Sequence, residues 1–243
     1  YSSARQDQIN LLPPEVLHQV FRHLDPPDLQ SAVLVCRLWR EVAEAPSLWS
    51  WVGLRLTREN QSTMLEFLER RRMKHVRKIW LEEVTAEVLQ AVVRHQGLRV
   101  MQGICWRHGG YQTHPKVVLD TMDPSLIAKA VTKMEKLKLV CPQLTFRQVE
   151  AILTTISTGK CQLKDLQISC VNSMSELDPN LLARAVNELE NFDMRNNELN
   201  MHQLEVILTA ISRGHSKVKT LNIKGQCAST LDIGLLARAV RRM

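Results

Sequence analysis

The chain has 243 residues, of which 44% are hydrophobic and 23% charged, and its formal net charge is +7. These proportions are typical of folded proteins, so disorder is not expected. No apolar run approaches the roughly 20 residues that span a bilayer, and we expect no membrane partner. The positive charge could attract an acidic protein, a phosphorylated peptide or nucleic acid, and by itself it selects none of them.

Cysteine usage indicates a reducing compartment. The six cysteines form no C-x-x-C pair, so their spacing favours neither a disulfide framework nor a zinc ribbon. We therefore expect reduced thiols in a cytoplasmic and/or nuclear protein. These cysteines are Cys36, Cys105, Cys141, Cys161, Cys170 and Cys227.

The first fifty residues predict three short helices. Prolines and helical apolar spacing predict the first over 11–24, and the Asp25–Asp28 turn ends it and begins a second. A third follows through Trp39 and Ala43. So small a unit cannot bury all its large apolar groups, and an exposed apolar patch marks a partner site. The alternative is that the surplus packs on the domain that follows.

The motif in this segment resembles an F-box. Its first half reads Leu12-Pro13-x-Glu15-Val16-Leu17-x-x-Val20-Phe21-x-x-Leu24. Its second half reads Asp28-Leu29-x-x-Ala32-x-x-Val35-Cys36-Arg37-x-Trp39-Arg40-x-Val42-Ala43, followed by Leu48-Trp49. The resemblance implies docking on a Skp adaptor and, through it, on a cullin and a RING subunit. It places Trp39 and Trp49 in internal or linking positions, and it implies adaptor contacts from Leu12, Pro13, Val16, Leu17, Phe21 and Leu29.

The remainder of the chain is repetitive. Asp123-Pro124-Ser125-Leu126-Ile127-Ala128 returns as Asp178-Pro179-Asn180-Leu181-Leu182-Ala183, about 55 residues later. Each 55-residue unit contains two copies of a short apolar pattern, which we call a frame. A frame consists of one apolar residue and two more, three and five positions after it. Clear frames begin at Met134, Leu163, Leu189 and Val218, and weaker ones at Trp51, Val76 and Leu98.

These frames resemble leucine-rich repeats of the ribonuclease-inhibitor type. The predicted fold class is therefore α/β: a three-helix F-box at 8–50, then a leucine-rich-repeat solenoid at 51–243 with parallel strands on its concave face and helices on its convex face. Another frame is due near Met243, so we expect the repeats to continue.

Solenoids of this kind bind partners through outward side chains of the strands, which alternate with buried ones. An outward Trp80 would be an interface anchor, although it could instead pack on a neighbouring repeat or on the F-box. Four of these side chains are cations and suggest a basic stripe for an acidic or phosphorylated protein, with a merely solvated surface as the alternative. They are Lys136, Lys138, Arg195 and Lys224. The predicted substrate-binding residues are Trp80, Lys136, Lys138, Gln167, Asn191, Asp193, Arg195, Asn222 and Lys224.

Two further segments are weaker candidates. Residues 106–115 interrupt the repeats and suggest a recognition loop, while Cys105, His108 and His114 lack the fourth ligand and the spacing of a metal site. The basic run 69–78 could bind nucleic acid or act as a nuclear signal, but we favour the basic end of a solvated helix.

No nucleotide-binding, hydrolase or metalloprotease motif is present, and we predict neither catalysis nor a cofactor. The sequence favours a non-catalytic receptor that holds a protein substrate beside a ubiquitin ligase. One alternative is a scaffold or inhibitor whose helical N-terminus caps the solenoid, and a more distant one is a nucleic-acid-binding module.

Overall fold

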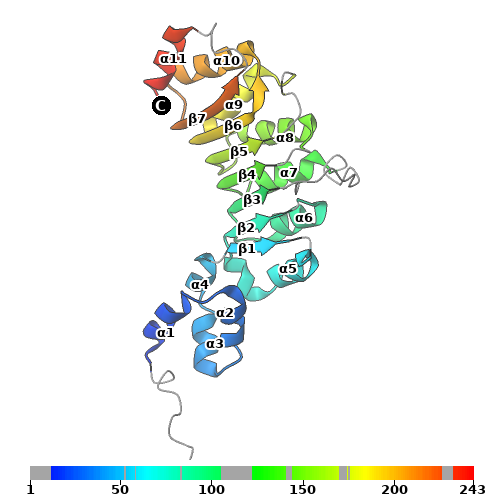
Figure 1. The fold of residues 1–243 in the computed structure, drawn as a ribbon, viewed down its shortest axis with the longest axis vertical. Helices are drawn as coiled ribbons and strands as arrows, with labels where there is room; N and C mark the ends of the chain where they lie inside the picture. The colour runs from blue at the N-terminus through cyan, green and yellow to red at the C-terminus, as the bar shows by residue number, and fades with distance from the viewer. Residues whose placement is uncertain are drawn as a thin grey trace, which may run out of the picture.

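The protein is a helical unit joined to a single curved stack of strands and helices (Figure 1). The computed structural model describes residues 12–51, 53–57, 59–82, 84–104, 122–140, 144–169, 174, 176–225 and 232–243. None of the helices in these ranges is long and apolar enough to cross a bilayer.

The helical unit contains the three predicted helices and a fourth. They are α1 (Pro14–Phe21), α2 (Pro26–Ala32), α3 (Arg37–Ala43) and α4 (Pro46–Trp51). Prolines occupy the first turns of α1 and α2, where a backbone N–H would have no helical partner. The Cys36 thiol caps α3 by accepting a hydrogen bond from the Trp39 amide at 3.5 Å. Each helix therefore begins where its sequence offers a cap or a proline.

The sheet confirms the predicted solenoid. Seven parallel strands lie side by side in chain order, and they pair residue by residue from Leu54 in the first strand to Leu221 in the last. All seven predicted frames form strands, including the three weaker ones. The strands are β1 (Gly53–Leu56), β2 (Lys78–Leu81), β3 (Val100–Ile104), β4 (Lys136–Val140), β5 (Asp165–Ser169), β6 (Asn191–Leu199) and β7 (Thr220–Gly225).

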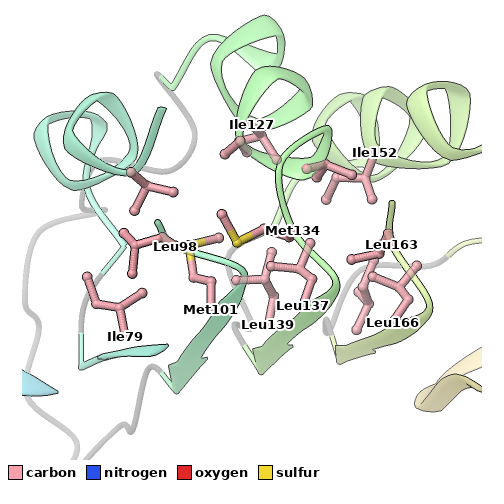
Figure 2. Close-up of a cluster of buried hydrophobic side chains, with 14 of the residues drawn as sticks. Ile79, Leu98, Met101, Ile127, Met134, Leu137, Leu139, Ile152, Leu163 and Leu166 are labelled. Atoms are coloured by element: carbon pink, nitrogen blue, oxygen red, sulfur yellow. The ribbon is translucent and has the colours of Figure 1, made fainter. Parts of the chain in front are cut away.

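Helices cover one face of this sheet and leave the other open (Figure 1). Between the two layers, strand side chains such as Met101 and Leu137 meet helix side chains such as Ile127 and Ile152 (Figure 2). The helices are α5 (Gln61–Leu68), the 3-10 helix η2 (Arg71–His75), α6 (Ala86–Arg94), α7 (Pro124–Val131), α8 (Phe146–Ser157), α9 (Pro179–Glu188), α10 (Met201–Ser212) and α11 (Ile233–Val240).

The basic run at 69–78 does not end a solvated helix, contrary to the expectation from sequence. Helix α5 ends at Leu68, and the run continues as η2 and the start of β2. Met73 and Val76 within it are fully buried. The run is therefore anchored in the core by two buried side chains.

Trp49 joins the helical unit to the solenoid. Its indole Nε1 donates a hydrogen bond of 2.7 Å to the Ala43 carbonyl, so its polar end is satisfied inside the helical unit. Its ring meets Phe67 of α5 edge to face, with centroids 6.4 Å apart. Trp49 is fully buried, which confirms its predicted internal position. This contact gives the two parts one continuous hydrophobic core.

Buried glutamines tie successive repeats together. Gln203 of α10 accepts a hydrogen bond from the Asn200 amide through its Oε1, which completes a capping box. Its Nε2 donates to the carbonyls of Met174 and Leu177, at 2.7 and 2.9 Å, in the preceding repeat. Gln148 has the equivalent role in α8. One amide thus satisfies the backbone of two repeats.

We expect Gln203→Leu to lower the free energy of unfolding by about 3 kcal/mol, because it leaves buried backbone groups without partners. Urea unfolding followed by circular dichroism measures this change. The exposed Gln90→Leu is the matched control, and it should shift the free energy by less than about 0.5 kcal/mol. Equal effects of the two substitutions would contradict the role given to Gln203.

His95 anchors η2 to the turn before β3. Its Nδ1 accepts hydrogen bonds from the amides of Gly97 and Leu98, both at 3.1 Å, and its Nε2 contacts the Met73 carbonyl at 2.8 Å. This pattern requires a neutral ring with its proton on Nε2. Burial, together with the nearby Lys133 and Arg99, holds the pKa of His95 below its usual value.

Stability should therefore fall on acidification. Since the pKa of His95 is lower in the folded state, the unfolded chain binds more protons as pH falls through its ordinary value near 6.5. We expect the free energy of unfolding to decrease from pH 7 to pH 5, with a weaker decrease in His95→Gln. Urea unfolding at each pH measures both slopes, and identical slopes would refute the assignment.

Candidate partner-binding surfaces

Among the described side chains of the helical unit, four large apolar ones are exposed. Val16 and Val20, one turn apart on α1, are 38% and 41% exposed, while Leu34 and Val35, in the turn after α2, are 80% and 56% exposed. We call these four residues the helical surface. Apolar groups this exposed on so small a unit are typical of a partner-binding surface.

Three of the predicted adaptor contacts lie elsewhere. Leu17, Phe21 and Leu29 are at most 1% exposed and form the core of the helical unit. Phe21 packs edge to face on Trp39, with centroids 5.1 Å apart. Because such side chains offer no surface, the prediction that they face a partner does not fit this structure. Val16 and Pro13 are exposed, and Leu12 is partly buried against the core.

The open face of the sheet arranges side chains in rows, because paired residues in parallel strands point the same way. The row through the middle of the strands, which we call the middle row, contains Arg55, Trp80, Gln102, Lys138, Gln167, Asp193 and Asn222. The row nearer the strand starts, the first row, contains Gly53, Lys78, Val100, Lys136, Asp165, Asn191 and Thr220. Most of the residues predicted to bind substrate belong to these rows.

Trp80 lies flat across the first strands of the open face. A methyl group on Gly53 of β1 would lie 1.6 Å from the indole Cζ3, so only glycine leaves room for the ring. The indole Nε1 donates a 2.7 Å hydrogen bond to Oε1 of Gln102 on β3. The ring is 38% exposed despite these contacts. Trp80 is thus a held aromatic platform that spans three strands.

The predicted basic stripe is partly neutralised. Nζ of Lys136 is 2.6 Å from Oδ2 of Asp165. The other carboxylate oxygen of Asp165, Oδ1, accepts a hydrogen bond from Nδ2 of Asn191. Burial alone would raise the pKa of Asp165, but these hydrogen bonds hold it below its usual value, and they raise the pKa of Lys136. Lys136 is therefore not a free cation, and it forms a polar cluster with Asp165 and Asn191.

The structure describes the side chain of only one of the other three cations of the predicted basic stripe. Lys138 is half-buried and has no ion-pair partner among the residues described by the structure. The side chains of Arg195 and Lys224 lie outside the described residues, as do the predicted loop at 106–115 and the trio Cys105, His108 and His114. In the described part of the chain, no three His, Cys, Asp or Glu side chains are grouped as metal ligands.

Two side chains on the open face were not predicted from sequence. Arg55 forms an ion pair of 2.9 Å with Glu82, beside Trp80 in the middle row, and Gln102 fixes the indole. The signal for Arg55 was its place between Leu54 and Leu56 in a weak frame. Gln102 was harder to identify, because its strand carries Gly103 where the other frames have a large apolar residue.

We expect Gly53→Ala to displace the Trp80 indole and break its hydrogen bond to Gln102, because the new methyl group would overlap the ring. The ¹⁵N–¹H signal of the indole, assigned with Trp80→Phe, measures this displacement. Gly234→Ala on the remote α11 is the control and should leave that signal in place. An unchanged indole signal in Gly53→Ala would contradict the platform geometry.

Comparisons with known proteins address both parts of the chain. Residues 9–55 match a family model described as F-box-like. The chain is also similar to F-box/LRR-repeat protein 8 from Bos taurus, with 27% identity over 166 residues. This match spans 64% of the chain and 43% of that relative, so it covers less than half of the relative's length.

Proposed function

We propose that this chain, an F-box protein with leucine-rich repeats, is the substrate-recognition subunit of a Skp–cullin–F-box ubiquitin ligase. F-box domains in general bind a Skp adaptor, and leucine-rich-repeat members of this group are generally non-catalytic. The helical unit would dock on the adaptor, and the open face of the sheet would bind the protein to be ubiquitinated. The observation that carries the proposal is the exposed helical surface beside a separate, polar open face.

The mechanism would be positioning alone. A receptor accelerates transfer by holding the acceptor lysine of its substrate near the ubiquitin-carrying subunit, which replaces a bimolecular encounter by a local one. Such a device needs a stiff link between its two docking surfaces. The buried Trp49, bonded to Ala43 and packed on Phe67, supplies that link.

The helical surface is the proposed adaptor site, with Leu34 and Val35 as its most exposed members. Apolar anchors that become buried contribute most of the affinity of such interfaces. Pro13, Pro14 and Glu15, which precede Val16 in the chain, are also exposed, and Glu15 is the charged residue among them. The buried Leu17, Phe21 and Leu29 would act indirectly, by holding α1 and α2 in place.

Charge placed on the helical surface should abolish adaptor binding without unfolding the chain. We expect Leu34→Asp or Val20→Asp to weaken binding to a Skp adaptor more than tenfold, because the carboxylate would be buried without a partner. Co-purification followed by isothermal titration measures the affinity. Phe21→Asp would be uninformative, since it disrupts the core.

Ile233→Asp is the matched control, because Ile233 is equally apolar, 82% exposed and located on α11 at the other end of the solenoid. It should leave adaptor binding unchanged. A wild-type chain that stays uncomplexed in excess adaptor, or equal losses in Leu34→Asp and Ile233→Asp, would contradict the proposal.

A second reading, in which the helical unit only caps the solenoid, is favoured by one observation. The unit shares a continuous core with the first repeat through Trp49, as a cap would. A cap, however, needs no exposed apolar residues such as Val20 and Leu34. The adaptor titration separates the two readings directly.

A further inference from the structure

A row of charges runs along the edge of the sheet where the strands begin. Successive members are linked by backbone hydrogen bonds of 2.7–2.9 Å, each amide donating to the carbonyl of the previous member. We call it the edge row. It contains Arg77, Arg99, Glu135, Lys164, Glu190 and Lys219.

From β4 onward the edge row neutralises itself. Glu190 is 3.3 Å from Lys164 and 2.6 Å from Lys219, and these contacts lower the pKa of its carboxyl. Arg99 and Glu135 approach to 4.0 Å. Arg77, directly before β2, breaks the alternation of charges, because the next member of the row, Arg99, is also a cation. Arg77 has no ion pair among the described residues.

Arg77 lines a hollow of about 360 Å³ at the junction of the helical unit and the solenoid. Its walls come from α4, η2 and the edge row. Its charged lining is Lys74, Arg77 and Arg99 against the single carboxylate of Glu135. His75 also lines it, and burial followed by the nearby Lys74 lowers the pKa of that ring, which is thus neutral at pH 7. The net charge of the lining residues that the structure describes is therefore +2.

One of these cations, Arg99, is held in place by hydrogen bonds. Nη1 of Arg99 donates to the carbonyls of Gln96 and Leu98, both at 2.8 Å, which fixes the guanidinium. A Cβ on Gly97 would lie 2.0 Å from the Lys74 carbonyl, so glycine lets η2 pack tightly there. Ser47 and Ser50 on the α4 wall are already bonded, to His18 and to a backbone carbonyl. The cationic side chains of Lys74 and Arg77 therefore supply donors to the hollow.

We infer that this junction hollow binds the phosphoryl group of a phosphorylated peptide, a substrate class that rests on the receptor function proposed above. A phosphomonoester carries close to two negative charges and three acceptor oxygens, which match a lining of net charge +2 better than one carboxylate does. The hollow exceeds the size of a free phosphate and has room for the side chain that carries it.

The position of the hollow favours a peptide over a free anion. Lys78, the residue after Arg77, is exposed on the open face, and the Trp80 platform follows two residues later. At about 3.3 Å per residue, Arg77 and Trp80 are roughly 10 Å apart along the strand. A single extended peptide could therefore place an apolar side chain on Trp80 and a phosphorylated one in the hollow.

The test is a titration of the isotopically labelled full chain, followed by the amide signals of Arg77 and Arg99. The probe is acetyl-Leu-Ala-Ala-phosphoserine-Ala-amide, whose leucine lies three residues from the phosphoserine and can therefore reach Trp80. It is compared with its serine and glutamate counterparts and with inorganic phosphate. We expect saturable shifts with the phosphopeptide, binding at least about tenfold weaker with the glutamate peptide and with inorganic phosphate, and none with the serine peptide.

Arg77→Gln should weaken phosphopeptide binding at least about tenfold, the factor for one charge-assisted hydrogen bond. Lys160→Gln removes the same charge from an exposed site that follows α8 in the chain, and it should change nothing. Absence of saturable shifts, or equal losses in both variants, would overturn the site. Inorganic phosphate that binds as tightly as the phosphopeptide would overturn the peptide as its occupant.

The result is separable from the adaptor proposal. Arg77→Gln should still bind the Skp adaptor, because Arg77 is not part of the helical surface. A chain that binds the phosphopeptide but no adaptor would refute the receptor function and leave the junction hollow as a phosphate site.

Discussion

The packing of each repeat against the next is the constraint on which the rest of the structure depends. An inward side chain on one strand, such as Leu137, is covered by neighbouring strands and by the helices behind them, so no repeat is complete alone. Parallel pairing then places every outward side chain in line with those of its neighbours. The rows of the open face and the edge row are consequences of burying the leucines.

The same packing explains why a small helical unit can expose apolar residues. Its own core is small, but Trp49 extends it into the first repeat and thereby adds the solenoid's buried area. Val20 and Leu34 can then face solvent without loss of the fold. A receptor with two docking surfaces requires this arrangement, in which buried residues at the junction supply stability and exposed residues supply recognition.

Much of this organisation could be predicted from the sequence, because burial imposes a period. The frames at Met134, Leu163, Leu189 and Val218 predicted four strands, and even the weak frame at Leu98 proved correct. Alternation then placed Trp80 and Lys138 outward. Helix α1 was different, since Val16 and Leu17 are both apolar and adjacent, and only the packing of α3 decides which of them faces inward.

Interactions between repeats were beyond prediction for a physical reason. The pairing of Lys136 with Asp165 and of Trp80 with Gln102 depends on which residues become neighbours across strands far apart in sequence. A run of cations therefore suggested a basic stripe, whereas the structure neutralises part of it. Among the described residues, Arg77 and Lys74 gather beside a hollow where the alternation of the edge row breaks.

Hydrogen–deuterium exchange of the chain with and without a Skp adaptor tests the central claim most directly. The account predicts new protection in α1 and in the turn that carries Leu34 and Val35, with no change in β1–β7. Protection confined to the strands, or none anywhere at saturating adaptor, would contradict it.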